Sequence, residues 1–236
     1  MFYFLFIIIW YFTILPLCFL IVYPFYRINI IEYTKHITKD VLKIKHIITK
    51  DAEYINSGFI LANHRCWTGF FLDPVISNSA IVARRMAILA FLFMCTLHHL
   101  QTGIISINKN KDTRQQIYKK IKEKMIYSFD SKFKRIVFWP EGSRLRYTTL
   151  NSPEDVKKYL KYGLLKEIYY DNIFPVQLQI SSNKEFVIDE KNMVINKNIF
   201  VKTHISLPIY PKDYPTEHEF YNTIAKEWYN AWIKVN

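Results

Sequence analysis

The amino-acid sequence predicts an α/β domain with a largely parallel central sheet flanked by helices, preceded by an N-terminal membrane-anchoring helical segment. Short apolar runs alternate with stretches of helical spacing, and no internal repeat or long linker interrupts the 236 residues. The segment 1–26 contains no charged side chain, which predicts the anchor. We therefore expect a membrane anchor at 1–26 and a single α/β domain at 27–236.

The N-terminal segment is long enough to cross a bilayer. As one helix, residues 1–26 would extend roughly 39 Å at about 1.5 Å per residue. A secretory signal would show a basic start and a small-residue cleavage site, and neither is present. Pro16 and Pro24 can kink or divide the helix, so an in-plane hairpin stays open as an alternative, as does a tilted buried helix.

The net charge of +12 fits a membrane surface better than a nucleic-acid partner. A basic stretch follows the anchor directly and contains few acidic residues: Arg27, Lys35, Lys39, Lys43, Lys45 and Lys50, against Glu32 and Asp40. Such a flank is typical of the cytosolic side of a membrane segment, so we expect the main domain to face the cytosol. No nucleic-acid motif accompanies the charge, and the expected partner is membrane lipid, not nucleic acid.

The elements of the domain are predicted from apolar periodicity and turn residues. The strand candidates are GFILA at 58–62, AIVA at 80–83, GIISI at 103–107, RIVFW at 135–139, IFPVQLQI at 173–180 and short strands within 185–207. The helix candidates are 65–77, MAILAFLFMCTL after Arg84-Arg85, 111–129, 153–169 and 216–234. The stretch MAILAFLFMCTL has only about a dozen apolar residues, so it predicts a buried or interfacial helix and not a second span.

The three cysteines predict neither a disulfide nor a metal site. Cys18 lies in the anchor, while Cys66 and Cys95 are isolated and lack C-x-x-C spacing. The group Cys95, His98 and His99 lies in an apolar stretch without further ligands, which favours a packed or interfacial helix face. We therefore expect a reduced, cytosol-facing domain and assign no metal ligand.

A first chemical motif, Asn63-His64-Arg65, stands where a predicted strand ends and a helix begins. In open α/β sheets, ligands bind at this edge, because loops and helix N-termini converge there. A histidine can act there as a general base near neutral pH. A purely structural histidine is the alternative, and His64 alone does not decide between the two.

A second motif follows the strand RIVFW: the loop Pro140-Glu141-Gly142-Ser143-Arg144. Gly142 permits an unusual turn and the close approach of a ligand. Arg144 offers a rigid donor fork suited to phosphate, and backbone amides with the Ser143 hydroxyl can add further bonds. An ordinary turn with exposed arginines is the alternative for this loop considered alone.

Together the two motifs resemble the phospholipid and glycerol acyltransferase family, and 1-acyl-glycerol-3-phosphate acyltransferases in particular. NHRCWTGFFLD is similar to the family's first block, N-H followed by four residues and an aspartate. VFWPEGSR resembles the block F-P-E-G-T/S-R, with Trp139 between Phe138 and Pro140. GIISINK and KYGLLKEIYYDNIFPVQLQ are similar to the second block and to the K-x-G and later apolar blocks. The resemblance covers roughly residues 58–180.

The resemblance implies transfer of a fatty acyl group from acyl-CoA or acyl carrier protein, with no bound cofactor. The acceptor would be the hydroxyl of lysophosphatidic acid, a related lysophospholipid or glycerol phosphate, in phospholipid synthesis. By the family pattern, His64 removes the proton of the acceptor. The acceptor phosphate would be held by Glu141, Gly142, Ser143, Arg144 and Lys109, the last standing where an arginine is usual.

The sequence departs from the pattern at Gly69, where the family carries an aspartate that orients the histidine. In the serine-protease triad, loss of such a group costs about 10⁴ in rate. Asp73, one helical turn further, can substitute for it, or Thr68, a backbone carbonyl or water can orient His64. Alternatively, the protein is a catalytically impaired homologue that acts as a membrane lipid-binding protein. The presence of His64, Glu141 and Arg144 favours an enzyme.

Overall fold

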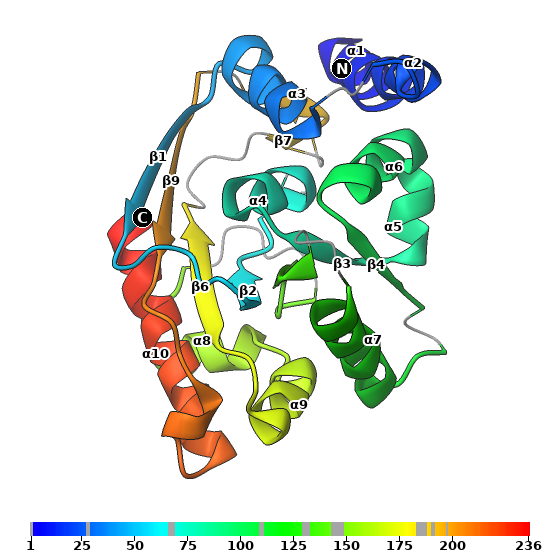
Figure 1. Ribbon diagram of the computed structural model, residues 1–236. Coiled ribbons are helices and arrows are strands. Elements are labelled where there is room, and N and C mark those ends of the chain that lie inside the picture. Colours follow the sequence, from blue (N-terminus) through cyan, green and yellow to red (C-terminus); the bar gives the residue numbers. More distant parts are fainter. Residues whose placement is uncertain are drawn as a thin grey trace.

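The computed structural model describes residues 2–26, 29–65, 69–108, 111–128, 133–142, 149–182, 188–189, 192–196 and 198–236 (Figure 1). Its main sheet has seven strands in the order β1-β9-β6-β2-β5-β3-β4. Neighbouring strands are parallel except β6 and β9, which pair antiparallel. The predicted fold class, an α/β domain with a largely parallel sheet, is therefore confirmed.

The strands of the main sheet are mostly short and apolar. They are β1 Lys45–Lys50, β2 Gly58–Ala62, β3 Ala80–Arg84, β4 Ile104–Ile107, β5 Arg135–Phe138, β6 Val176–Ser181 and β9 Phe200–Ile205. A separate two-stranded sheet pairs β7 Ile188–Asp189 with β8 Val194–Ile195. Every residue of β2 and β6 is buried. Strand β2 is continuously apolar, as is typical of a strand covered on both faces, whereas the buried Gln177 and Gln179 of β6 have hydrogen-bond partners.

Helices cover both faces of the sheet (Figure 1). One layer holds α7 Arg114–Tyr127, α8 Pro153–Tyr159, α9 Gly163–Asp171 and α10 Glu217–Val235. The other holds α3 Ile30–His36 with the π-helix η2 Ile37–Val41, α4 Gly69–Ser77, α5 Arg85–Ala90 and α6 Leu92–Gln101. A 3-10 turn, η4 Pro211–Asp213, precedes α10.

Strand β2 divides its side chains between the two layers. Phe59 and Leu61 belong to the apolar cluster under α7 to α10, whereas Ile60 and Ala62 belong to the cluster on the opposite face. This follows from the period of two in an extended strand. Both faces of the central sheet are therefore covered by side chains and closed to water. A ligand can approach the sheet only at the ends of its strands.

The register of the parallel strands determines which loops meet. In the pairing of β2 with β5, Leu61 lies opposite Phe138. His64 and Glu141 each follow three residues beyond these positions. Because parallel strands end at the same edge, the two predicted motifs emerge side by side.

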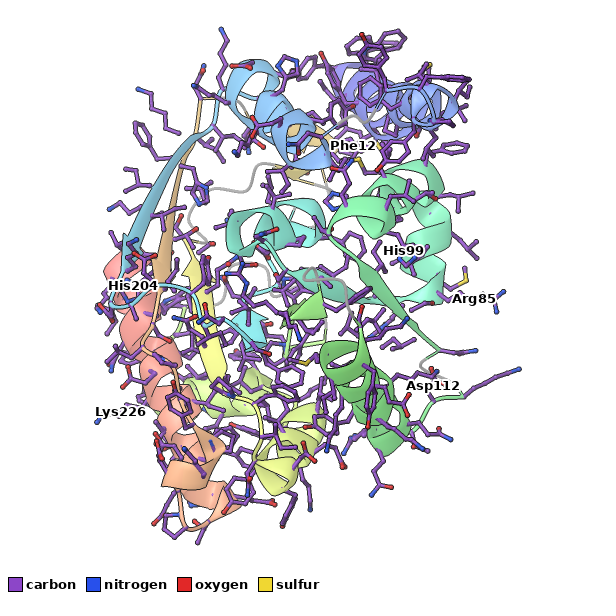
Figure 2. The ribbon with its side chains drawn as sticks, viewed as in Figure 1. Phe12, Arg85, His99, Asp112, His204 and Lys226 are labelled. Atoms are coloured by element: carbon purple, nitrogen blue, oxygen red, sulfur yellow. The ribbon has the colours of Figure 1, made fainter. Side chains whose placement is uncertain are left out.

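The N-terminal segment is a continuous helix, Phe2–Val22, formed by α1 Phe2–Ile9, the π-helix η1 Trp10–Ile14 and α2 Leu15–Val22. By length and composition it can cross a membrane. One face packs on the domain, where Phe12 meets Phe91 edge-on and the Tyr33 hydroxyl donates to the Tyr11 carbonyl oxygen. Figure 2 shows Phe12 between this helix and α6. The remaining apolar side chains of the helix are largely exposed.

Several predicted elements need correction. The expected helix 153–169 is two helices, α8 and α9, because the Lys161 N–H leaves the helical pattern and donates to the Pro140 carbonyl oxygen at 2.9 Å. The stretch after Arg84 is likewise two helices, α5 and α6. Strand β1 and helix α3 were not predicted, since their sequences are too polar to show a clear apolar period.

Candidate active site

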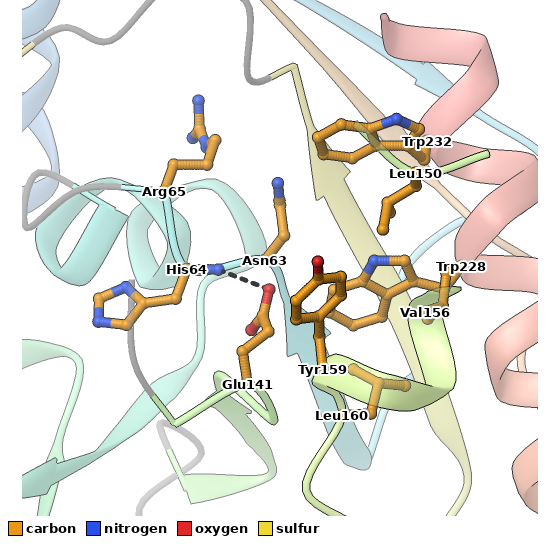
Figure 3. Close-up of a pocket in the computed structure, with 10 residues that line it drawn as sticks. All are labelled: Asn63, His64, Arg65, Glu141, Leu150, Val156, Tyr159, Leu160, Trp228 and Trp232. Atoms are coloured by element: carbon orange, nitrogen blue, oxygen red, sulfur yellow. Dashed lines mark hydrogen bonds between the residues drawn. The ribbon is translucent and has the colours of Figure 1, made fainter. Parts of the chain in front are cut away.

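His64 lies in the short segment that leaves β2 at the carboxyl edge of the sheet. Its backbone N–H donates to Glu141 Oε1 at 3.1 Å (Figure 3). The preceding Asn63 is held by two side-chain bonds to Ser181 of β6, each 2.8 Å long. Through these bonds the Asn63 side chain continues the hydrogen bonding between β2 and β6 beyond the end of β2. The backbone around His64 is therefore held on one side by β6 and on the other by Glu141, which follows β5.

Glu141 is buried, and burial raises the pKa of its carboxyl group to about 8, with a smaller contribution from the charge of Asp73. A carboxyl group with this pKa is mostly protonated at pH 7. Its described contact is with the His64 backbone, so Glu141 joins the two motifs. The predicted contact of Glu141 with a substrate phosphate stays a prediction.

Gly142 forms a turn that few other residues could adopt. Its φ is +67°, in the left-handed region, and its N–H donates to the Trp139 carbonyl oxygen at 3.1 Å. A Cβ here would lie 3.0 Å from Lys161 Nζ. The Gly142 carbonyl oxygen accepts a hydrogen bond from Arg84 Nη2 at 3.0 Å. Two cationic side chains therefore lie against the turn.

Three of the residues predicted to hold phosphate lie outside the described residues: Lys109, Ser143 and Arg144. Thr68, one alternative for orienting His64, does as well. Arg84 and Lys161 are described cations beside the same turn, and sequence reasoning did not single them out. A signal was present for each, because Arg84 ends a short strand and Lys161 opens the K-x-G segment.

A groove of about 840 Å³ runs beside His64. This volume is within the usual range for pockets that hold organic ligands. Its lining is mostly apolar, with His64, Arg84 and Arg114 as the polar groups. The apolar lining includes Phe70, Phe91, Ile107, Ile117, Phe138 and Leu164. The groove therefore offers an apolar surface, cations and a histidine to one ligand.

A second, much smaller cavity of about 20 Å³ is lined in part by His64, Glu141, Tyr159 and Trp228. It has room for about one water molecule. In Figure 3 the imidazole of His64 points away from Tyr159 and Trp228, whereas its backbone faces Glu141. The two sides of residue 64 thus have different surroundings: backbone bonds on one and the larger groove on the other.

Asp73 of α4 lies close to this site. Its side chain is 1% exposed; Oδ2 accepts the Trp139 indole N–H at 2.8 Å, and Oδ1 lies 3.8 Å from Arg65 Nη2. Burial raises the pKa of the Asp73 carboxyl to about 6, against the opposing influence of Arg65 and Trp139. The Trp139 ring also faces His64, with centroids 5.2 Å apart and an interplanar angle of 32°.

The group Cys95, His98 and His99 forms part of helix α6. Cys95 and His98 are buried, and His98 Nδ1 lies 3.2 Å from Thr102 Oγ1. Burial lowers the pKa of His98 to about 3 and raises that of the Cys95 thiol to about 12, so both groups are neutral at pH 7. Within the described part of the chain, no group of three or more His, Cys, Asp or Glu residues is placed to hold a metal ion.

These features define an α/β fold with a histidine site at the carboxyl edge of its parallel sheet. The same fold is found in the crystal structure of the 1-acyl-sn-glycerophosphate (LPA) acyltransferase, PlsC, from Thermotoga maritima. The two structures agree with a TM-score of 0.67 over 99% of this chain and 94% of the other, at 14% sequence identity. No protein-family model and no curated protein sequence matches the chain. The likeness to PlsC establishes the fold.

Proposed function

We propose that this protein is an acyltransferase. It would move a fatty acyl group from acyl-CoA or acyl carrier protein to the hydroxyl of lysophosphatidic acid or a related lysophospholipid, in phospholipid synthesis. The observation that carries this proposal is His64 on the wall of a groove that combines an apolar lining with two arginines. The similarity of the fold to that of PlsC supports the same conclusion.

His64 acts in this scheme as the general base. The acceptor oxygen attacks the thioester carbonyl carbon, a C–O bond forms, and the C–S bond breaks. The imidazole takes the proton of the hydroxyl and returns it to the thiolate that leaves. The scheme needs no bound cofactor or metal, because the thioester already provides an activated acyl group.

The acceptor phosphate would bind at the turn of Gly142. Arg84 uses one N–H on the Gly142 carbonyl oxygen, and its guanidinium has further donors for an anion. Lys161 lies beside the same glycine. Ser143, Arg144 and Lys109 are proposed as additional phosphate contacts, as the family resemblance implies.

We further infer that residues 1–26 anchor the protein in a membrane and that residues 27–236 form the acyltransferase domain on its cytosolic side. Exposed apolar side chains of the N-terminal helix, such as Phe2 and Phe6, support this. Helix α5, which packs against α6, also exposes the apolar side chains of Met86 and Leu89, and these support contact of the domain with the membrane surface. A lipid acceptor could then reach the groove from the bilayer without crossing water.

The test is an assay of membranes that contain the protein, with acyl-CoA and lysophosphatidate. We expect His64→Ala to lower turnover by about 10²- to 10⁴-fold, the usual contribution of a general base. His218→Ala is the matched control, because His218 is an exposed histidine of α10 outside the groove. Equal rates of acyl transfer for wild type and His64→Ala would refute the proposal that the protein is an acyltransferase with His64 as its base.

The second candidate is a lipid-binding membrane protein with impaired catalysis. It is favoured by Gly69, which supplies no carboxylate, and by Asp73, whose Oδ2 is bonded to Trp139. This candidate predicts that lysophosphatidate binds to wild-type protein and that no acyl transfer follows. Binding and turnover measured on the same preparation separate the two.

A further inference from the structure

Gly69 and Asp73 share one region of space. Both belong to α4, where residues four apart lie on the same face and side chains lean toward the helix N-terminus. A Cβ built on Gly69 would lie 3.1 Å from Asp73 Oδ2. The carboxylate of Asp73 therefore crowds the space into which a side chain at position 69 would extend.

The indole of Trp139 is anchored in this space by Asp73. An indole N–H is a donor only, so its 2.8 Å bond to Asp73 Oδ2 specifies the direction of the ring. Because the carboxylate is 1% exposed, water does not compete for this bond. Phe70, one residue after Gly69, stacks on the same indole with centroids 5.8 Å apart.

The other neighbour of the indole is the histidine. The rings of Trp139 and His64 are 5.2 Å apart at 32°, within the range at which a cation is attracted to the face of tryptophan. In the proposed mechanism, His64 becomes positively charged when it takes the proton of the acceptor. The attraction therefore acts on the imidazolium that forms during the reaction and much less on the neutral imidazole, and this difference is what accelerates a chemical step.

We propose that Trp139, anchored by Asp73, is a positioning residue that orients the His64 ring and stabilises its protonated form during acyl transfer. The inference rests on the proposed function and deepens it. The pair takes over, through an aromatic ring, the task that a carboxylate at position 69 would perform directly. An indole face does not accept the imidazole N–H as a carboxylate does, so this arrangement supports a slower base.

Two substitutions test the inference by separating the ring from its anchor. Trp139→Leu removes the aromatic face, and we expect kcat to fall about tenfold while KM for lysophosphatidate changes less than about threefold. Asp73→Asn keeps an oxygen for the indole N–H but loses the charge, and a smaller fall is expected. Tyr118→Phe is the matched control, since it removes a 2.6 Å bond from a ring hydroxyl to Asp171, and neither residue lines the groove.

The pH profile separates this role from mere packing. Without the indole the imidazolium is less stable, so the acidic limb of the kcat profile should move roughly half to one unit toward lower pH in Trp139→Leu. Among the residues that the structure describes, the charged or titratable groups around His64 are Glu141, Arg65, Asp73 behind the indole, Arg84 and Arg114 in the groove, and Lys161 at the turn of Gly142. Trp139→Leu keeps all of these side chains, but Asp73 loses its hydrogen bond from the indole. The same profile is therefore recorded for Asp73→Asn, and a larger shift in Trp139→Leu than in Asp73→Asn reports on the aromatic face.

A titration of the His64 ring by NMR gives a readout that needs no turnover. A lower pKa of His64 in folded Trp139→Leu supports the inference even if no acyl transfer is detected, in which case only the proposed function has failed. An unchanged pKa, or an unchanged kcat profile in an active enzyme, overturns it. If Trp139→Leu does not fold, Trp139→Phe is measured instead; it keeps a weaker aromatic face, and a shift of the same sign is required.

Discussion

Two aspartates of this molecule have the same kinds of partner in opposite surroundings. Asp73, inside the domain, meets the indole nitrogen of Trp139 and the guanidinium of Arg65. Asp51, just after β1, meets His204 Nε2 at 2.9 Å and Lys234 Nζ at 2.7 Å. The side chain of Asp73 is 1% exposed, and that of Asp51 is 38% exposed. Figure 2 shows His204 beside α10, in β9, the strand next to the edge strand β1.

The two carboxyl groups respond in opposite directions. Burial raises the pKa of Asp73 to about 6, although a cation and an indole N–H lie nearby. The hydrogen bond from Lys234 lowers the pKa of Asp51, with a further contribution from His204. Desolvation therefore outweighs the partners in the interior, and the partners outweigh desolvation at the rim. Asp51 joins the last helix to the sheet edge, whereas Asp73 holds a side chain beside the candidate catalytic histidine.

The largest expected difference is in stability. Asp73→Ala leaves the buried Arg65 guanidinium without its carboxylate, and we expect a loss of about 3 to 5 kcal/mol in the free energy of unfolding. Asp51→Ala at the half-exposed rim should cost about 1 kcal/mol or less. Urea denaturation of the detergent-solubilised protein measures both. Equal losses would contradict the contrast between interior and rim.

The next effect is a pH dependence of opposite sign. The folded-state pKa of Asp73, about 6, lies above its unfolded value, so the folded protein binds more protons between about pH 4 and 6. Its contribution to stability is therefore fully present at low pH and is lost as the pH rises through 6. For Asp51 the folded pKa is lowered, so its contribution is present near neutral pH and is lost as the pH falls below about 4.

Two variants separate these contributions in denaturation curves recorded from pH 3 to pH 8. In wild type, the titration of Asp73 should lower the free energy of unfolding by at most about 3 kcal/mol between about pH 4 and 6, and this decrease should be absent in Asp73→Asn. Asp51→Asn should remove a smaller loss on the acidic side. The sign is the decisive observation: a wild-type contribution of Asp73 that grew with pH would show that Arg65, and not burial, dominates its surroundings.

The smallest effect comes from adding a second carboxylate to each region. Gly69→Asp places one against Asp73, where two buried charges cannot both ionise, and we expect roughly 1 to 3 kcal/mol of destabilisation and lower turnover. Ala52→Asp adds one beside Asp51 at the rim, where water screens it, and should change stability by at most about 0.5 kcal/mol. The double variant Gly69→Asp with Asp73→Ala should recover activity relative to Gly69→Asp alone. A gain in rate from Gly69→Asp by itself would contradict the idea that Asp73 fills that space.

The sequence by itself determined the class of the fold and the meeting of the two motifs. Apolar runs such as 58–62 and 135–139 are strands because only the interior of a sheet accommodates them, and parallel strands end at one edge. In the sequence, His64 and Glu141 were joined in one site by the resemblance to the acyltransferase family, and the structure shows the hydrogen bond between them. The roles of Ser143, Arg144 and Lys109 stay predictions.

Tertiary structure decided the parts that depend on contacts between distant residues. Helix 153–169 is interrupted because Lys161 bonds to Pro140, a partner that no local pattern reveals. In the sequence, Trp139 was only an additional residue between Phe138 and Pro140 of the second motif. In the structure, its ring lies between Asp73 and His64. A backbone pattern is local and repeats along the chain, whereas the direction of a buried polar side chain depends on which donor and acceptor meet it after folding. For that reason the sequence at Gly69 indicated only that the expected carboxylate is missing. The structure shows that the carboxylate of Asp73 lies 3.1 Å from the position that a Cβ of residue 69 would take.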